Sequence, residues 1–275
     1  MILLLVVFCA LFLYSGYKLI AIQRIYQKGL DTYDAIAEAA YSDPQPATEP
    51  AAQQPEQQTD ISIPEVKEDD VEEQLKDYVP LPPYEPLLNV NFDKLLSMNP
   101  DTVGWINMEG GQLDYPIVRG PDNDYYLRRL FDGTYNWNGS IFMDYRNAPD
   151  FSDRNTFIYG HNMGNGTMFA VLLNYSTPGF YEQNPELILV TPDASYYLRP
   201  FSGYVTTANA GAYRMEFEDD ESFSTYLETI IGWSEFVSDV EVTEKDRIVT
   251  LSTCSYLFNN ARYVLHCKLD LVGKK

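Results

Sequence analysis

Cys254 and Arg262 have the side-chain types and the spacing expected of a thiol nucleophile that attacks an amide and a cation that assists it. Cys254 ends the segment RIVTLSTC, whose residues alternate as in a β-strand, and Asn259-Asn260 then signals a turn. A hairpin would therefore place the Arg262 guanidinium near the Cys254 thiol. A nearby cation lowers the pKa of a thiol and can stabilise the oxyanion formed when a thiolate attacks an amide. Arg262 could equally be an ordinary arginine on an exposed strand face.

An amide-cleaving thiol also needs a proton donor for the leaving amine, and the chain has 2 histidines. His161 follows the strand-like NTFIYG and opens a loop, a position where catalytic groups are common. It could also be a turn histidine that bonds to local backbone. His266 lies within a strand-like segment, about 13 Å beyond Arg262 along a strand, so we expect a structural role for it. Tyr159, two residues before His161, is a candidate for the wall of a cleft.

The remaining cysteines give no sign of metal chemistry. Cys267 shares its strand face with Tyr263, Leu265 and Leu269, so we expect a buried core cysteine rather than a disulfide with Cys254. Cys9 lies in an apolar N-terminal run. No zinc-type spacing is present, and we expect neither a metal nor a cofactor.

Acidic residues dominate the charge of the chain. It has 40 Asp and Glu against 19 Lys and Arg, a formal net charge of -21, which argues against nucleic acid as a partner. Hydrophobic residues make up 45%, enough for a folded core. The Pro-, Gln- and Glu-rich composition of residues 41–86 predicts disorder.

The N-terminal residues predict a membrane anchor. Residues 1–14 carry no charge, and a helix over residues 1–22 would be about 33 Å long, enough to span a bilayer. A cleaved signal peptide is the alternative. Lys18, Arg24 and Lys28 follow the apolar run, and the positive-inside rule alone would place the rest of the chain in the cytoplasm.

Three regions are expected along the chain: a transmembrane anchor over residues 1–22, a juxtamembrane segment and acidic Pro-rich spacer over 23–86, and a catalytic domain over 87–275. Many short β-type segments separated by turn residues predict a mainly β barrel or sandwich in the last of these. Helices are expected over residues 91–99, 167–174 and 219–236. The strand-like segments are VGWINM, LDYPIV, SIFMDY, NTFIYG, ELILV, SYYLRPFSGYV, RIVTLSTC and RYVLHCKLDLV.

Several of these segments resemble the class B sortases, a family of cysteine transpeptidases. TLSTC at 250–254 with Ala261-Arg262 is similar to the family's nucleophile strand and arginine, and YGHNM at 159–163 is similar to its histidine segment. VGWINMEGGQLDYPIVRGPDNDYYL, SIFMDYRN and NTFIYGHNMGNGTMF resemble class B in the same way. The resemblance covers about residues 88–272.

The resemblance implies an eight-stranded sortase β-barrel with N-terminal helical structure and a helix between the sixth and seventh strands. It implies that Cys254 is the nucleophile, His161 the general acid and base, and Arg262 the oxyanion or substrate-positioning group. Tyr159 and Ser252 match positions that hold the sorting peptide, and we add their neighbour Thr253. The family's contacts around residues 208–213 cannot be assigned, because this sequence departs from the pattern there.

The implied reaction cleaves a C-terminal sorting signal after threonine and passes the acyl group to an amine of a peptidoglycan precursor, lipid II. The partners would then be surface proteins with such a signal, and the enzyme would sit in the cell membrane of a Gram-positive-type bacterium with its catalytic domain outside. Polymerisation of pilin through a lysine, hydrolysis with water as acceptor, and an inactive surface-binding module are the alternatives.

Overall fold

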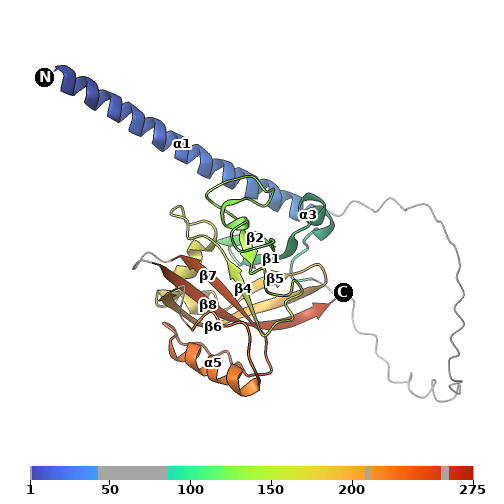
Figure 1. Cartoon of the computed structure of the whole chain (residues 1–275). Coiled ribbons are helices and arrows are strands. Elements are labelled where there is room, and N and C mark those ends of the chain that lie inside the picture. Colours follow the sequence, from blue (N-terminus) through green and yellow to red (C-terminus); the bar gives the residue numbers. More distant parts are fainter. Residues whose placement is uncertain (1, 43–85, 208–210, 255–259, 275) are drawn as a thin grey trace, which may run out of the picture.

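A closed barrel of eight strands forms the body of the molecule (Figure 1). The computed structural model describes residues 2–42, 86–207, 211–254 and 260–274, without the side chains of residues 2–6 and Cys254. The strands are β1 (Thr102–Met108), β2 (Leu113–Val118), β3 (Ile141–Met143), β4 (Asn155–Tyr159), β5 (Leu187–Val190), β6 (Ala194–Thr207), β7 (Ile248–Cys254) and β8 (Ala261–Lys274). Each lies within or over a segment that the sequence predicted to be a strand, so the predicted mainly β, eight-stranded barrel is confirmed.

The barrel closes in the order β1-β2-β3-β4-β7-β8-β6-β5. Two neighbouring pairs, β2–β3 and β4–β7, are parallel, and the other pairs are antiparallel. Parallel strands need a crossover between them. The crossover from β4 to β7 contains β5, β6 and α5 (Asp220–Gly232), so two segments distant in the chain lie side by side at the site described below.

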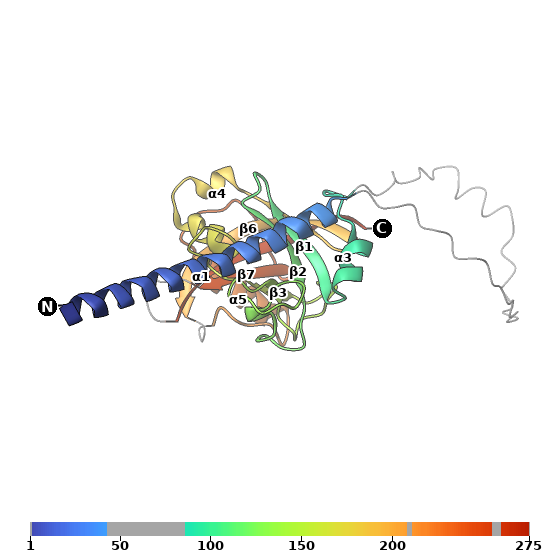
Figure 2. The same ribbon diagram turned by 90° about the horizontal axis from the view of Figure 1, so that it is seen from above.

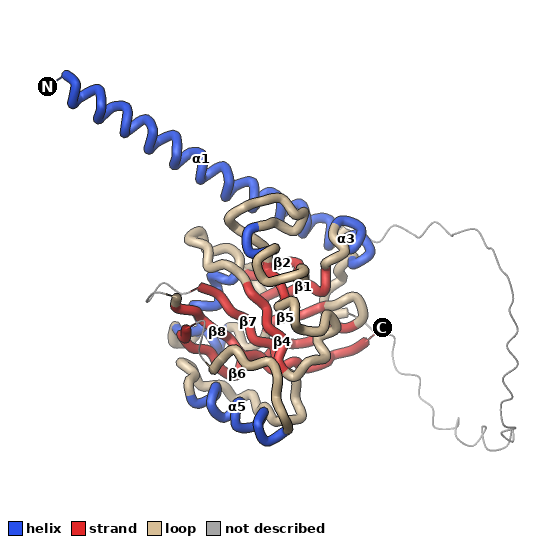
Figure 3. Tube along the Cα trace, in the orientation of Figure 1, coloured by secondary structure: helices blue, strands red, loops and turns tan. Residues whose placement is uncertain are grey.

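Alternation in β7 and β8 sorts their side chains into two cores. Val249, Leu251 and Cys267 belong to the main core of the barrel. Ile248 and Val264 belong to a second cluster beneath α5. Helix α5 lies on the opposite side of the barrel from α1 (Ile2–Ala40) and α3 (Phe92–Met98), as Figure 3 shows.

Helix α5 confirms the predicted helix between the sixth and seventh strands. Its N-terminus is capped by Asp219, which accepts a hydrogen bond from the backbone N–H of Ser222 at 2.8 Å. Helical spacing then buries one apolar face against the barrel, made by Phe223, Tyr226, Leu227 and Ile230.

The other helical segments are short. Helix α3 begins at the cap residue Asn91 and ends before Pro100, as predicted. The helix expected over residues 167–174 is a 3-10 segment, η2 (Phe169–Ser176), which begins after Met168 at a positive φ of 58°. A second 3-10 turn, η1 (Tyr126–Arg128), and a short helix, α4 (Phe180–Gln183), lie in loops that the sequence did not predict to be helical.

Helix α1 is continuous from Ile2 to Ala40, and its two halves have different surroundings. The second half packs on the barrel, where Tyr33, Ile36 and Ala40 are buried in the main core. The first half projects beyond the barrel, as seen from above in Figure 2, and its side chains from Val7 to Ile22 are mostly exposed.

No helix in the described part of the chain is long and apolar enough to cross a membrane. The predicted transmembrane anchor over residues 1–22 and the predicted single-pass cell-membrane localisation are therefore wrong, whereas membrane contact through this helix stays a prediction. The apolar run is interrupted by Lys18 and followed by Arg24, and the same helix continues into the half that packs on the barrel. The spacer predicted up to residue 86 falls mostly on residues 43–85, which lie outside the described residues, and the domain boundary at residue 87 stays a prediction.

Candidate active site

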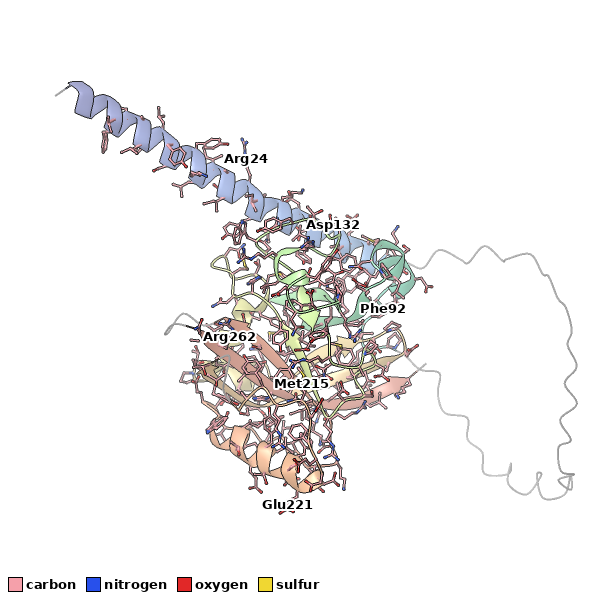
Figure 4. The ribbon with its side chains drawn as sticks, viewed as in Figure 1. Arg24, Phe92, Asp132, Met215, Glu221 and Arg262 are labelled. Carbon is pink, nitrogen blue, oxygen red and sulfur yellow. The ribbon has the colours of Figure 1, made fainter. Side chains whose placement is uncertain are left out.

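The β7–β8 pair brings two of the candidate residues to the same level of the barrel. Cys254 is the last residue of β7, and its backbone is the register partner of Arg262 in β8. Asn260 has a left-handed φ of 61° just before β8, as suits a turn residue. The hairpin predicted between Cys254 and Arg262 is thus confirmed for the backbone, while the Cys254 thiol lies outside the described structure. Figure 4 shows Arg262 at the rim where this pair of strands ends.

The parallel β4–β7 pair brings the histidine loop to the same rim. Its ladder ends with Tyr159 opposite Ser252, and the backbone N–H of Gly160 donates to the Ser252 carbonyl at 3.1 Å. His161 therefore leaves the sheet beside the last residues of β7. His161 lies where a strand gives way to a loop, as expected. The pairing of β4 with β7 brings this residue near the end of β7.

The His161 ring is held by a backbone carbonyl. Its Nε2 lies 2.6 Å from the carbonyl oxygen of Leu127, in η1. A carbonyl can only accept, so the hydrogen-bond network assigns the ring proton to Nε2 in the neutral form. Nδ1 is then the unprotonated nitrogen of the neutral ring, which is the arrangement of a base whose orientation is set by its other nitrogen.

A cleft of about 310 Å³ lies where these elements meet. It is lined by Asn123, Leu127, Phe142, Arg146, Tyr159, Gly160, His161, Tyr213, Ser252, Thr253 and Arg262. Five predicted site residues thus share one cleft, namely His161, Arg262, Tyr159, Ser252 and Thr253. The structure brings them together from three strands and one loop. The backbone of Cys254 follows Thr253 in β7 and lies opposite Arg262 in β8.

Aromatic rings and one hydroxyl pair form part of the cleft wall. Tyr213 stacks on Phe157 with ring centroids 5.6 Å apart, and Phe157 in turn stacks on Tyr159. The hydroxyls of Tyr213 and Ser252 lie 2.7 Å apart and form a hydrogen bond. Ser252 is therefore fixed from the loop that follows β6, in the region where the sequence allowed no assignment; residues 208–210 of that loop lie outside the described structure.

A buried carboxylate holds another part of the cleft wall. The Asp144 side chain is fully buried and accepts hydrogen bonds from the guanidinium of Arg146 at 2.9 and 2.8 Å and from the backbone N–H of Arg146 at 3.0 Å. Asn123 Nδ2 donates to it at 2.8 Å, and the Tyr159 hydroxyl at 3.0 Å. Since Asn123, Arg146 and Tyr159 all line the cleft, one carboxylate positions three of its groups.

These contacts fix the charge states of the wall. Burial alone would raise the pKa of Asp144, but the hydrogen bonds from Arg146, Asn123 and Tyr159 outweigh it and hold that pKa below its ordinary value. Burial, and then the negative charge of Asp144, raise the pKa of Tyr159. Asp144 is therefore a carboxylate and Tyr159 a neutral donor at neutral pH.

His266 and Cys267 lie apart from this chemistry, as expected. His266 is fully buried, with Nδ1 2.8 Å from the Thr250 hydroxyl and Nε2 3.2 Å from the Tyr204 hydroxyl. Burial lowers its pKa to about 3, so the ring stays neutral. Cys267 is a buried free thiol whose pKa is raised by burial. Both residues have the structural roles that their strand positions predicted.

Sequence reasoning missed several residues of the cleft. Asn123, Leu127 and Phe142 come from the loops and strand before β4, and Tyr213 follows β6. Asp144 and Arg146 lie inside SIFMDYRN, a segment noted as strand-like and for its resemblance, but neither residue was predicted to belong to the site. A carboxylate and an arginine two residues apart directly after an apolar strand are a signal that could have been used, whereas Asn123 and Tyr213 carry no local signal.

Comparison with known proteins agrees with this geometry. The model of the sortase domain matches residues 106–270 of the chain. Sortase B of Staphylococcus aureus (strain NCTC 8325 / PS 47) is 39% identical over 184 residues, which are 66% of this chain and 75% of the relative. Sortase B of Listeria monocytogenes serovar 1/2a is 39% identical over 177 residues, or 64% of this chain and 72% of the relative.

A solved structure of the same kind also matches. The Staphylococcus aureus sortase B–substrate complex superposes with a TM-score of 0.64 at 39% identity, covering 66% of this chain and 85% of that chain. The match to the sortase domain model includes the histidine loop, all of β7 and most of β8, so that similarity spans the cleft as well as the barrel.

Proposed function

Because this chain belongs to the sortase family and is a class B, sortase-type cysteine transpeptidase, we propose that it cuts a C-terminal sorting signal after threonine and transfers the acyl group to a cell-wall precursor amine. The observation that carries the proposal is the convergence of two strand registers. Tyr159 opposite Ser252 and Cys254 opposite Arg262 bring the histidine loop, the cysteine and the arginine to one rim of the barrel.

The proposed first step is attack of the Cys254 thiolate on the carbonyl carbon of the threonine. A C–S bond forms and the C–N amide bond breaks, while His161, as imidazolium, gives a proton to the leaving nitrogen. The products are a thioester and a free amine. In the second step the acceptor amine attacks the thioester, gives a proton back to His161, and releases the Cys254 thiolate.

The contact between His161 and Leu127 supports this assignment of the proton. In the imidazolium both ring nitrogens carry hydrogen, and Nε2–H is directed at the Leu127 carbonyl. The proton on Nδ1 is therefore the one available to the leaving amine. Arg262, paired with Cys254 across the hairpin, is proposed to stabilise the oxyanion or to position the peptide carbonyl.

The cleft is proposed to bind the sorting peptide through Tyr159, Ser252 and Thr253. Its volume of about 310 Å³ is at the lower end of the range for ligand pockets, as suits a few residues of an extended peptide. The similar Staphylococcus aureus enzyme has been solved as a substrate complex. We further propose that residues 87–275 form the catalytic domain, that surface proteins with a sorting signal supply the acyl group, and that the amine belongs to lipid II.

Trapping of the thioester tests the proposal. The purified chain is incubated with NPxTN-like and xPxTG-like peptides and examined by intact mass, with and without an added amine. We expect an adduct that Cys254→Ala cannot form and that the amine converts to an amide product. His161→Ala and Arg262→Lys are expected to lower kcat by about a hundredfold or more.

Two results would contradict the proposal. Absence of an adduct with every peptide, together with full activity of Cys254→Ala, would exclude the covalent mechanism. Adduct hydrolysis at a rate that no amine changes would instead indicate a hydrolase with water as the acceptor.

A further inference from the structure

Helix α1 touches the segment that holds the His161 ring. Tyr33, in the half of α1 that packs on the barrel, is buried, and its hydroxyl donates to the carbonyl oxygen of Gly139 at 2.7 Å. The same hydroxyl lies 3.0 Å from Oγ of Ser140. These are the residues just before β3, and they lie more than a hundred positions from Tyr33 in the chain.

Residues 126–140 form a loop whose two ends are tied together. The backbone N–H of Ser140 donates to the Tyr126 carbonyl at 3.0 Å, and its hydroxyl donates to the Arg129 carbonyl at 2.8 Å. The loop is tied to α1 a second time, because Nδ2 of Asn136 donates to the carbonyl of Ile25 at 3.0 Å. Figure 4 shows Asp132, within this loop, close beside α1. The helix therefore forms one side of the loop's support.

Gly139 transmits this support to the candidate active site. A Cβ placed on Gly139 would lie 2.6 Å from the Leu127 carbonyl oxygen and 3.0 Å from Cδ2 of His161. Its φ of 59° is left-handed, so glycine suits this position for conformation as well as for space. The backbone of Gly139 thus packs against both members of the hydrogen bond from His161 Nε2 to Leu127.

We infer that Tyr33 is a positioning residue for His161, acting from the N-terminal helix through Gly139. The Tyr33 hydroxyl fixes the carbonyl of Gly139, and Gly139 packs against the Leu127 carbonyl and the His161 ring. The Leu127 carbonyl in turn keeps the ring proton on Nε2. The inference rests on the proposed function, in which His161 must present Nδ1 to the substrate. It makes the docked half of α1 a part of the catalytic apparatus.

Tyr33→Phe tests the inference, because it removes the hydroxyl and keeps the ring in the core. The matched control is Tyr41→Phe, which removes the hydroxyl of a tyrosine directly after the same helix. Tyr41 donates to Oδ1 of Asp114 at 2.7 Å, on the β2 side of α1 and outside the cleft lining. Both variants are made in the full chain, and their thermal unfolding is recorded.

The first readout is the tautomer of the His161 ring, from the ¹⁵N shifts of the neutral imidazole. With only two histidines in the chain, His161→Ala assigns the spectrum by the signal it removes. We expect the wild type and Tyr41→Phe to show the Nε2–H form, and Tyr33→Phe to show a mixture of Nε2–H and Nδ1–H forms. The second readout is turnover of a sorting peptide, for which Tyr33→Phe should lower kcat about tenfold with KM unchanged.

An unchanged tautomer and an unchanged kcat in Tyr33→Phe would overturn the inference, as would an equal loss in Tyr41→Phe. If Tyr33→Phe does not fold, Ser140→Ala decides by the same readouts, since it removes the hydroxyl that ties Arg129 and contacts Tyr33. Wild-type turnover in His161→Ala would instead refute the proposed function. The tautomer of Tyr33→Phe would still decide whether Tyr33 positions the ring.

Discussion

Replacing Asp144 with asparagine tests whether one buried carboxylate organises the cleft wall. The change keeps the shape of the side chain but substitutes an NH₂ group for one of two oxygens that accept five hydrogen bonds in all. If the remaining oxygen stays at Oδ2, it keeps the bonds from Nη2 of Arg146, from Asn123 and from Tyr159. The new NH₂ then faces two donors, the backbone N–H and Nε of Arg146.

The expected loss of stability follows from these two donors. A buried donor without an acceptor costs about 1–3 kcal/mol. The Arg146 side chain is 57% exposed, so its Nε can turn to water, which leaves roughly one full penalty, or about 2 kcal/mol. For a domain of this size that corresponds to a fall in Tm of about 4–8 °C.

The loss should also appear in substrate binding. Asn123, Arg146 and Tyr159 line the cleft but are held by Asp144, so loosening them should raise KM about tenfold and change kcat less. Thermal unfolding and peptide-cleavage kinetics measure the two effects. Asp150→Asn is the control, because Asp150 is exposed and its carboxylate accepts from the backbone N–H of Ser152 at 3.1 Å in a surface turn; the change should shift stability by no more than about 0.5 kcal/mol.

The pH dependence provides a further check on the same residue. The pKa of Asp144 is lower in the folded chain than its ordinary value of 3.8. Its carboxylate therefore stabilises the fold at pH values above 3.8, and this stabilisation is lost as the pH falls through the folded pKa. The stability difference between the wild type and Asp144→Asn should therefore shrink in strong acid. A variant that melts within about 1 °C of the wild type, with KM within about twofold, would refute the reasoning.

Three other outcomes are expected. His266→Gln should flatten the pH dependence of unfolding. The pKa of the His266 ring is about 3 in the folded protein and 6.5 in the unfolded chain, so between pH 7 and pH 5 only the unfolded state binds a proton there, and the wild type should lose about 2 kcal/mol of stability. If chemical denaturation shows the same pH dependence for the variant and the wild type, the prediction is contradicted. A thiol-reactive reagent on the native chain should label Cys254 and spare Cys267, which burial keeps protonated, and peptide mapping that finds both labelled would show that the core opens. Tyr213→Phe keeps the stack on Phe157 but frees the Ser252 hydroxyl, so kcat/KM should fall about threefold to tenfold with Tm nearly unchanged; wild-type kinetics would exclude a positioning role for that hydrogen bond.

Local patterns in the sequence predicted the strands and which face of each strand is apolar. The period of two in β7 and β8 separated Cys267 from Cys254, and the short turn before β8 paired Cys254 with Arg262. The same local logic assigned His266 to a structural position. These predictions succeeded because side-chain alternation and a short hairpin depend on neighbouring residues only.

The cleft depended on contacts that no local pattern encodes. Asp144 became the centre of one wall because Asn123 and Tyr159 converge on it from different segments, and Tyr213 reached Ser252 from a loop with no recognisable motif. The parallel pairing of β4 with β7, which sets His161 beside the end of β7, required the whole crossover to fold back on the barrel.

The N-terminal helix shows the same division most clearly. Its apolar sequence correctly predicted a helix but also predicted a transmembrane anchor, although no helix in the described part of the chain is long and apolar enough to cross a membrane. Docking of Tyr33, Ile36 and Ala40 on the barrel decided that the second half of α1 belongs to the folded domain. By itself the sequence determined which segments form strands and helices and which face of each is apolar. The tertiary structure alone decided which faces meet, because closing the barrel selects partners that are far apart in the chain.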